Sequence, residues 1–249
     1  MKRKALLIGN SNGLAGVKLD IANWVKFLKS EKGGQWYGNE IDIVMNPKKP
    51  DILSRIANIK ASSPDFVIVV FSGHGAYQRK AVDGQTILEI NDNEVIGENN
   101  LIGIALRQIS VFDCCRGVLT EVLSESQKEV RAFSKGGTFQ QNVRSYYEKR
   151  IMEAMPQQIC LYACAIDESA MDTERGGIYT NQLLCCSSSF QKNESYKLVA
   201  KAHIAAAEGT RSAALCSKHT QNSDAIFQPD YSQQEQQQLI IGINPLANL

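Results

Sequence analysis

The sequence predicts an α/β fold in which a mostly parallel, doubly wound sheet carries helices on both faces. Short apolar segments alternate with amphipathic segments in the order β-α-β-α-β, which requires right-handed crossovers. Residues 66–71 form an unbroken apolar run, typical of a central parallel strand that is covered on both faces. The chain has 249 residues, 43% of them hydrophobic, which fits one large domain or a domain with a small appendage.

The first half of the chain supplies the elements of this pattern. Strands are expected at residues 4–9 and 41–45, in addition to residues 66–71. Between them, residues 14–30 carry apolar side chains every three to four positions, and so does the segment from 51 to about 62. That spacing predicts two amphipathic helices.

The second half continues less regularly. Residues 121–150 are charged and rich in Ser and Gln, which leaves open a helical excursion or an exposed linker, with a helix at 121–133 as one option. The other expected elements are a short strand at 85–90, a short helix at 101–106, strands at 109–112 and 158–164, helices at 179–186 and 196–216, a polar segment at 218–238 and a last strand at 239–243.

Composition excludes several classes of protein. A net charge of +1 gives no bulk attraction for a nucleic acid polymer or an acidic membrane surface. There is no run of 18 apolar residues, and the apolar stretch near the start is too short for a secretory signal. The seven cysteines are odd in number and form no C-x-x-C pair, which argues against a disulfide framework and a zinc site. We therefore expect a cytoplasmic protein with reduced cysteines.

Two of the predicted strands end in reactive side chains flanked by glycine. Ser72-Gly-His-Gly75 follows one strand, and Asp113-Cys-Cys-Arg-Gly117 follows another. Sites in doubly wound sheets form at the carboxyl ends of strands, so we expect His74 and Cys115 to lie close together. A thiol nucleophile with an imidazole that exchanges its proton is the catalytic pair of cysteine proteases, and the amides of Gly75 and Cys115 are candidate donors to an oxyanion. Cys114 is expected to point the opposite way, into the core.

These two segments resemble the signatures of the caspase and metacaspase proteases. The likeness continues along the chain in residues 5–10, 14–16, 20–23, 160–164, 167–168, 177–180 and 228–229. The resemblance implies a caspase-like sheet of six strands in a single catalytic domain, residues 1–249. Within it, residues 1–117 would correspond to the large subunit, 118–155 to an intersubunit linker and 156–249 to the small subunit.

The resemblance also implies a specificity. Caspases that cut after Asp carry Gln two positions before the nucleophile, whereas Asp113 occupies that position here, as in metacaspases. Carried over residue by residue, the substrate-binding residues would be Asp20, Ser72 and Asp113. Two carboxylates in a narrow site favour Arg or Lys and repel an acidic side chain. Arg116 departs from the metacaspase pattern, and it would either neutralise these acids or be solvated.

The resemblance leaves control of the enzyme open. A calcium site would draw on Asp92, Glu94 and Glu98, although acids on a loop are more often simply solvated. Self-cleavage in the linker is a second possibility, after Arg131, Lys135, Arg144, Lys149 or Arg150; an ordinary charged surface helix is the alternative. Because no recruitment domain is recognisable, we expect an activating protein, a small signalling ligand, a metal or self-processing. The resemblance to compact bacterial members of the family also implies a role in a stress or antiviral programme.

Three other functions are open on the sequence alone. The first is a protease that cuts peptides after Asp. The second is a non-catalytic caspase-fold module that binds a partner protein. The third is a flavodoxin-like ligand-binding module that uses the Asn10–Gly16 loop, although this loop lacks the G-x-G-x-x-G pattern and the Walker lysine.

Overall fold

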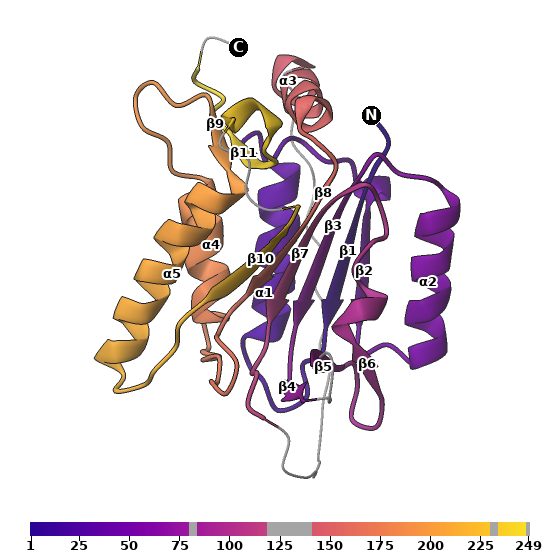
Figure 1. The fold of residues 1–249 in the computed structure, drawn as a ribbon, viewed down its shortest axis with the longest axis vertical. Helices are drawn as coiled ribbons and strands as arrows, with labels where there is room; N and C mark the ends of the chain where they lie inside the picture. Colours follow the sequence, from indigo (N-terminus) through magenta and orange to yellow (C-terminus); the bar gives the residue numbers. More distant parts are fainter. Residues whose placement is uncertain (80–83, 119–140, 230–233, 248–249) are drawn as a thin grey trace.

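The central element is a six-stranded, mostly parallel sheet with helices on both faces, which confirms the predicted fold class (Figure 1). The computed structural model describes residues 1–79, 84–118, 141–229 and 234–247. The strand order is β10-β8-β7-β3-β1-β2, and only the edge strand β10 runs antiparallel to its neighbour. The strands are β1 (Arg3–Gly9), β2 (Ile41–Met45), β3 (Phe66–Ser72), β7 (Arg107–Asp113), β8 (Gln157–Tyr162) and β10 (Asp224–Gln228).

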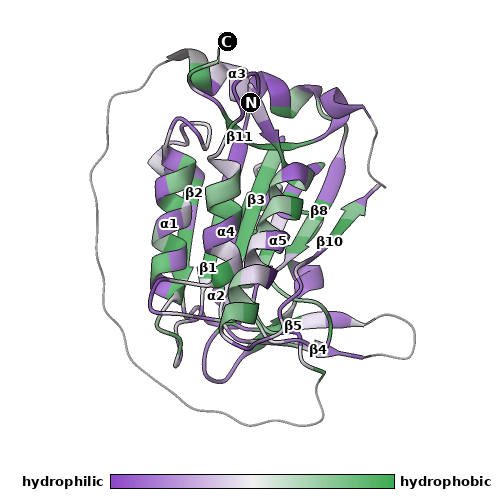
Figure 2. Ribbon diagram, turned by 90° about the vertical axis from the view of Figure 1, so that its left-hand side faces the viewer, coloured by the Kyte–Doolittle hydropathy of each residue, from purple (hydrophilic) through white to green (hydrophobic). Residues whose placement is uncertain are grey.

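The helices divide the core into two apolar clusters, one on each side of the sheet. The helices are α1 (Val17–Lys29), α2 (Lys49–Ala61), α3 (Gln141–Glu153), α4 (Ile178–Ser187) and α5 (Val199–Cys216). Residues of α1, α3, α4 and α5 pack on one face and residues of α2 on the other. Figure 2 shows the apolar strands lying behind α1, α4 and α5. No helix within the described ranges is long and apolar enough to cross a membrane.

Two small sheets lie outside the main one. At the carboxyl end of the central strands, β4 (Gly75–Gln78), β5 (Gln85–Glu89) and β6 (Val95–Gly97) form an antiparallel sheet. At the opposite end, β9 (Tyr196–Leu198) pairs with β11 (Ile240–Ile243). The predicted last strand therefore exists but joins β9, and residues 196–198, predicted as helix, are its partner.

Two other local predictions were wrong. Residues 101–106 form bends instead of a helix, because the side-chain amide of Gln108 satisfies their backbone: Ile104 N donates to its Oε1 at 2.8 Å, and its Nε2 donates to Leu101 O. The polar segment 218–238 contains the strand β10. An exposed edge strand needs few apolar side chains, so its sequence gave little signal.

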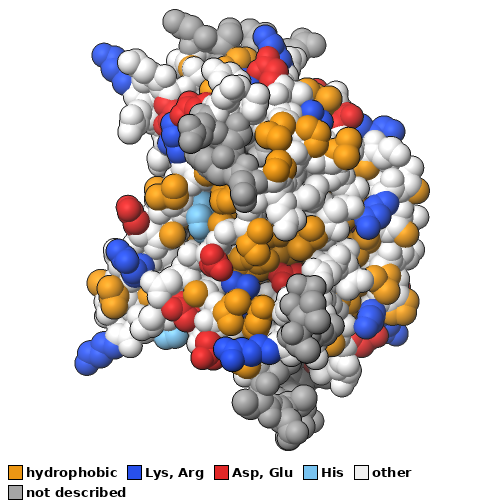
Figure 3. All heavy atoms as spheres, viewed as in Figure 1, with side chains coloured by type: hydrophobic (Ala, Val, Ile, Leu, Met, Phe, Trp, Pro, Cys, Tyr) orange, Lys and Arg blue, Asp and Glu red, His pale blue; other side chains and the backbone are white. Residues whose placement is uncertain are grey.

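The segment predicted as helix or linker is described only in its second part. Residues 119–140, including the predicted helix at 121–133, lie outside the described ranges. Residues 141–153 form α3, which buries Val143, Tyr147 and Ile151 in the core. On the face of the molecule seen in Figure 3, acidic and basic side chains are interspersed, in keeping with the small net charge.

Candidate active site

The register of the central strands brings the two glycine-flanked segments together. Strands β3 and β7 are parallel neighbours in which Ser72 pairs with Asp113. His74 and Cys115 each follow two residues later, so both lie just beyond the carboxyl end of the sheet. The segments stay hydrogen-bonded past the strands: Gly73 N donates to Asp113 O at 3.1 Å.

Gly75 lies where the two segments approach each other most closely. A Cβ atom at this position would be 2.7 Å from Cys114 Sγ and 3.0 Å from the carbonyl oxygen of Cys115. Such distances are shorter than real Cβ contacts, so the packing requires glycine here. The close approach keeps the backbone of Gly75 beside the segment that carries the thiol.

The imidazole of His74 is held by a backbone carbonyl. Its Nε2 lies 2.7 Å from the carbonyl oxygen of Asn12, in the loop that follows β1. Because a carbonyl oxygen only accepts, Nε2 must carry the proton of the neutral ring. Nδ1 is then the nitrogen that is able to accept a proton.

The two adjacent cysteines face different surroundings. Cys114 is buried, and burial raises the pKa of its thiol well above its ordinary value, which fits the expected inert residue. Cys115 is partly exposed, and its Sγ lies 3.7 Å from the carbonyl oxygen of Ala170. Of the two thiols, Cys115 alone is accessible to a substrate.

Asp20, Ser72 and Asp113 come together at the carboxyl ends of β3 and β7. Asp20 projects from the first turn of α1, is 1% exposed, and accepts hydrogen bonds from Ser72 Oγ at 2.8 Å and Gly177 N at 2.9 Å. Asp113 ends β7, is 6% exposed, and accepts a hydrogen bond from Thr180 N at 3.0 Å. Both carboxylates are thus tied to the start of α4.

Burial and mutual repulsion weaken the acidity of both groups. Burial is the main cause that raises the pKa of Asp20, and the neighbouring Asp113 raises it further. Burial also raises the pKa of Asp113, against the hydrogen bonds from Thr180. Within the described ranges, no Lys or Arg forms an ion pair with either carboxylate. Among the described residues, the site is therefore an acidic one without a paired cation.

A third carboxylate, Asp172, joins this pair and was missed by the sequence reasoning. It belongs to residues 163–177, the segment between β8 and α4 that we call the acid loop. Its Oδ2 accepts a hydrogen bond from Gly16 N at 3.0 Å, and its charge contributes to the raised pKa of both Asp20 and Asp113. Asp172 is partly exposed, unlike the other two. An irregular loop has no periodicity, so only its position five residues before Gly177 was available as a signal.

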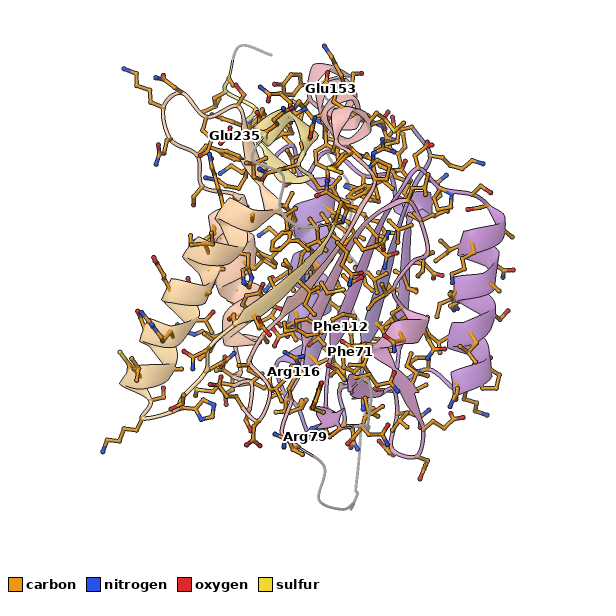
Figure 4. All side chains as sticks on the ribbon, viewed as in Figure 1. Phe71, Arg79, Phe112, Arg116, Glu153 and Glu235 are labelled. Atoms are coloured by element: carbon orange, nitrogen blue, oxygen red, sulfur yellow. The ribbon has the colours of Figure 1, made fainter. Side chains whose placement is uncertain are left out.

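Arg116 neither neutralises these acids nor lies in solvent, so both interpretations offered for it were wrong. The side chain is 3% exposed, and its guanidinium lies 3.9 Å from the ring centroid of Tyr162. Nη1 is 3.3 Å from Asp224 on β10 and 3.4 Å from Cys164 O. Figure 4 shows Arg116 toward the lower end of the sheet, where the strands that lead to His74 and Cys115 finish.

Two of the three acids considered for calcium, Glu94 and Glu98, bind backbone amides. Glu94 accepts a hydrogen bond from Lys49 N at the start of α2, whereas the buried Glu98 accepts one from Thr86 N. In the part of the chain that the structure describes, no group of three or more His, Cys, Asp or Glu side chains is arranged to hold a metal ion. The loop considered for nucleotide binding leads to an α1 N-terminus at which Asp172 already binds Gly16 N. That acid disfavours a phosphate there.

A doubly wound α/β domain with a histidine and a cysteine at adjacent strand ends has the architecture of a caspase-fold protein. A comparison with protein-family models agrees: the model described as the caspase domain matches residues 2–222. The chain therefore belongs to the caspase domain family, a family of cysteine peptidases. A search of curated proteins gave no match.

Solved structures show the same fold at low sequence identity. Caspase-1 from Spodoptera frugiperda is 14% identical, with a TM-score of 0.55 over 91% of this chain and 85% of that one. The Drosophila initiator caspase Dronc is 11% identical, with a TM-score of 0.52 over 90% and 79% of the two chains. A protein from Geobacter sulfurreducens is 13% identical, with a TM-score of 0.53 over 91% and 92%.

Proposed function

We propose that this protein is an endopeptidase that cuts peptide bonds after Arg or Lys with Cys115 and His74. The observation that carries the proposal is the acid cluster, by which we mean Asp20, Asp113 and Asp172. Two of its members are buried without a cation among the described residues. A guanidinium or ammonium group is the ligand that supplies the missing charge and donates to carboxylate oxygens.

The proposed catalytic cycle uses the side chains of Cys115 and His74 and the amides of Gly75 and Cys115. His74 Nδ1 accepts the proton of the Cys115 thiol, and the thiolate attacks the scissile carbonyl carbon. The amides of Gly75 and Cys115 donate to the oxygen that becomes negative. The protonated imidazole then gives its proton to the leaving amine, and water hydrolyses the resulting thioester. Asn12 O keeps Nε2 protonated throughout, so Nδ1 remains the exchanging nitrogen.

The acid cluster offers open acceptor positions to a basic side chain. The hydrogen bonds that Asp113 accepts from described residues all reach Oδ2, which leaves Oδ1 for a substrate. Asp172 is the most exposed carboxylate of the three, so an incoming cation meets it first. An aspartate side chain would meet three acids and no donor charge, which disfavours the alternative of cleavage after Asp.

Self-cleavage in the linker remains part of the proposal, over a narrower range. A protease binds its substrate in an extended conformation, whereas Arg144, Lys149 and Arg150 lie within the helix α3. Arg144 is held by Glu40 and Glu148, and Arg150 is buried. Arg131 and Lys135 lie outside the described ranges and are the candidates we retain. The division at residues 117 and 155 into large-subunit-like, linker and small-subunit-like parts belongs to the same proposal.

Control by an activating protein or a small ligand, and a role in bacterial stress or defence, stay expectations from the family resemblance. Two of the acids considered for a calcium site, Glu94 and Glu98, already bind the backbone amides of Lys49 and Thr86, so we propose no calcium requirement.

The test is cleavage of fluorogenic peptides that end in Arg, Lys or Asp, with the wild-type protein and Cys115→Ala. We expect turnover of the Arg and Lys peptides that disappears in the variant. Turnover of Asp peptides alone would keep the nucleophile but overturn the role of the acid cluster. No turnover of any peptide, together with no alkylation of Cys115 by iodoacetamide, would favour the non-catalytic interaction module.

A further inference from the structure

The acid loop is fastened to the rest of the domain by the residues between α5 and β10. His219 Nε2 donates to Ser169 O at 2.8 Å, and Asn222 N donates to Glu168 Oε2 at 2.6 Å. These two contacts lie at the surface. Between them in the chain, Gln221 is 1% exposed, and its side chain enters the interior beneath the loop.

The buried amide of Gln221 joins the first residue of the acid loop to a residue in its middle. Its Nε2 donates to Ala163 O at 2.9 Å, and its Oε1 accepts from Met171 N at 3.0 Å. The main-chain pairing of β8 with β10 ends at Tyr162 and Asp224, one residue before Ala163. Beyond the last β8–β10 pair, the side chain of Gln221 therefore supplies the hydrogen bonds of Ala163 O and Met171 N that no strand supplies.

Met171, the residue that Gln221 holds, lies between two functional positions. The preceding carbonyl, Ala170 O, is the partner of the Cys115 thiol, and the following side chain, Asp172, is the exposed member of the acid cluster. A shift of the Met171 amide would move both neighbours. The peptide that Gln221 fixes is thus common to the nucleophile and the specificity site.

A further hydrogen bond connects Met171 to α4, whose first turn binds Asp113. Met171 O accepts a hydrogen bond from Ile178 N at 3.1 Å, at the first residue of α4. The first turn of α4 contains Thr180, which donates to Asp113. Hydrogen bonds therefore run from Gln221 through the Met171 peptide to the start of α4 and the acid cluster.

We propose that Gln221 is a positioning residue that sets the acid loop for recognition of a basic side chain. The expected effect on KM rests on the proposed function. The expected effect on the position of the acid loop rests only on the two hydrogen bonds of the Gln221 amide. It acts through Met171 and touches neither the substrate nor the reacting atoms.

The test compares Gln221→Met with Ser223→Ala. Methionine keeps the length of the side chain but loses both hydrogen bonds. Ser223 Oγ donates to the same Ala163 carbonyl at 3.1 Å without a bond to Met171, so its variant is the matched control. We expect KM for Arg peptides to rise about tenfold in Gln221→Met, as for loss of a buried hydrogen-bonded pair. The rate of Cys115 alkylation by iodoacetamide should change less than KM, and Ser223→Ala should behave as wild type.

A second variant supplies a rescue. In Gln221→Glu, a protonated carboxyl still donates to Ala163 O and accepts from Met171 N, whereas an ionised one repels the carbonyl. The ratio of its kcat/KM to that of the wild type should therefore rise as the pH falls from 8 to 5.5. A merely space-filling role would give a ratio that does not depend on pH.

Hydrogen–deuterium exchange decides the inference independently of turnover. We expect faster exchange in peptides covering residues 168–177 of Gln221→Met, and unchanged exchange in Ser223→Ala. Unchanged exchange there would overturn the inference, as would wild-type KM in an active Gln221→Met. A wild-type protein that is silent toward basic peptides would contradict the proposed function instead, and exchange would still show whether Gln221 positions the loop.

Discussion

Individual carboxylates of the acid cluster differ in what a substitution would change. Asp172 has two tasks, since it accepts a hydrogen bond from Gly16 N, just before α1, and contributes negative charge beside Asp20. Asparagine retains this contact, because its side-chain oxygen accepts the same hydrogen bond, but it carries no charge. The variant Asp172→Asn therefore tests the charge of Asp172 without removing its hydrogen bond to Gly16 N.

We expect Asp172→Asn to raise KM for Arg and Lys peptides about five- to tenfold, the equivalent of about 1 kcal/mol for one partly exposed charge. Its melting temperature should stay within a few degrees of the wild type. Steady-state kinetics and thermal unfolding provide the comparison. Glu174→Gln is the control, because Glu174 is an exposed acid of the same loop. An equal effect of both variants would show that only net charge matters.

Arg116 follows the proposed nucleophile Cys115 in sequence, but its side chain packs on β8 and β10 instead of on the acid cluster. Its guanidinium stacks on Tyr162 and reaches Asp224, which connects the thiol segment to the edge strand β10. We expect Arg116→Met to lower kcat at least tenfold, because the segment that carries Cys115 loses this support while the acid cluster stays intact. KM for Arg peptides should change little. A large rise in KM with unchanged kcat would show that Arg116 serves substrate binding instead.

At the scale of elements, α3 is attached to the domain through charges at the end of the sheet opposite the site (Figure 1). Arg3 on β1 is fully buried and is paired with Glu40 at 3.4 Å. Glu40 also binds Arg144 of α3, which in turn binds Glu148 at 3.0 Å. This network joins the N-terminal strand β1 to α3.

Glu40→Ala should destabilise the protein by about 3 kcal/mol or more, because it leaves the buried guanidinium of Arg3 without its nearest carboxylate. Chemical denaturation measures this change. The kcat/KM of the folded variant toward Arg peptides should remain within about twofold of the wild type, since the network lies far from the strand ends that carry His74 and Cys115. A variant that is as stable as the wild type would show that Glu148 alone compensates Arg3.

The elements themselves were predicted unevenly. The strands near residues 4–9, 66–71, 109–112 and 158–164 were expected within a few residues of where they lie, because buried parallel strands are continuous apolar runs. The partly exposed strand at 41–45 was expected from its alternating apolar residues. The edge strand β10 and the short strand β9 were not expected. Their residues are polar or belong to a longer helical pattern, and their pairing is decided by partners distant in the chain.

At the scale of the whole molecule, stability depends on pH through the buried acids. Burial and Asp113 raise the pKa of Asp20 to about 8, well above the unfolded value of about 4. Between about pH 4 and pH 8, the folded protein therefore binds more protons than the unfolded chain. The stabilisation from Asp20 is complete below about pH 4, decreases as the pH rises, and is lost once the pH has passed about 8. His203, whose pKa burial lowers to about 4, acts in the opposite direction, but only below its unfolded value of about 6.5.

We expect the free energy of unfolding to fall by about 2 kcal/mol between pH 6.5 and 9, and the fall to be smaller in Asp113→Asn. The amide keeps the acceptor for Thr180 N but removes the charge that repels Asp20. Urea denaturation at several pH values measures both slopes. The same variant should lose at least a hundredfold in kcat/KM for Arg peptides. Parallel pH dependence of the two proteins would show that the acid pair is not the cause.

Sequence by itself determined the α/β class and placed His74 and Cys115 at strand ends, because apolar runs and glycine-flanked reactive residues are local patterns. It also indicated the family, which the match to the caspase domain confirms. Tertiary structure alone decided that Asp172 joins Asp20 and Asp113, that Arg116 turns toward β10, and that Gln221 holds Met171. These contacts join side chains to segments 50 to 156 residues away, and no local periodicity records such a pairing.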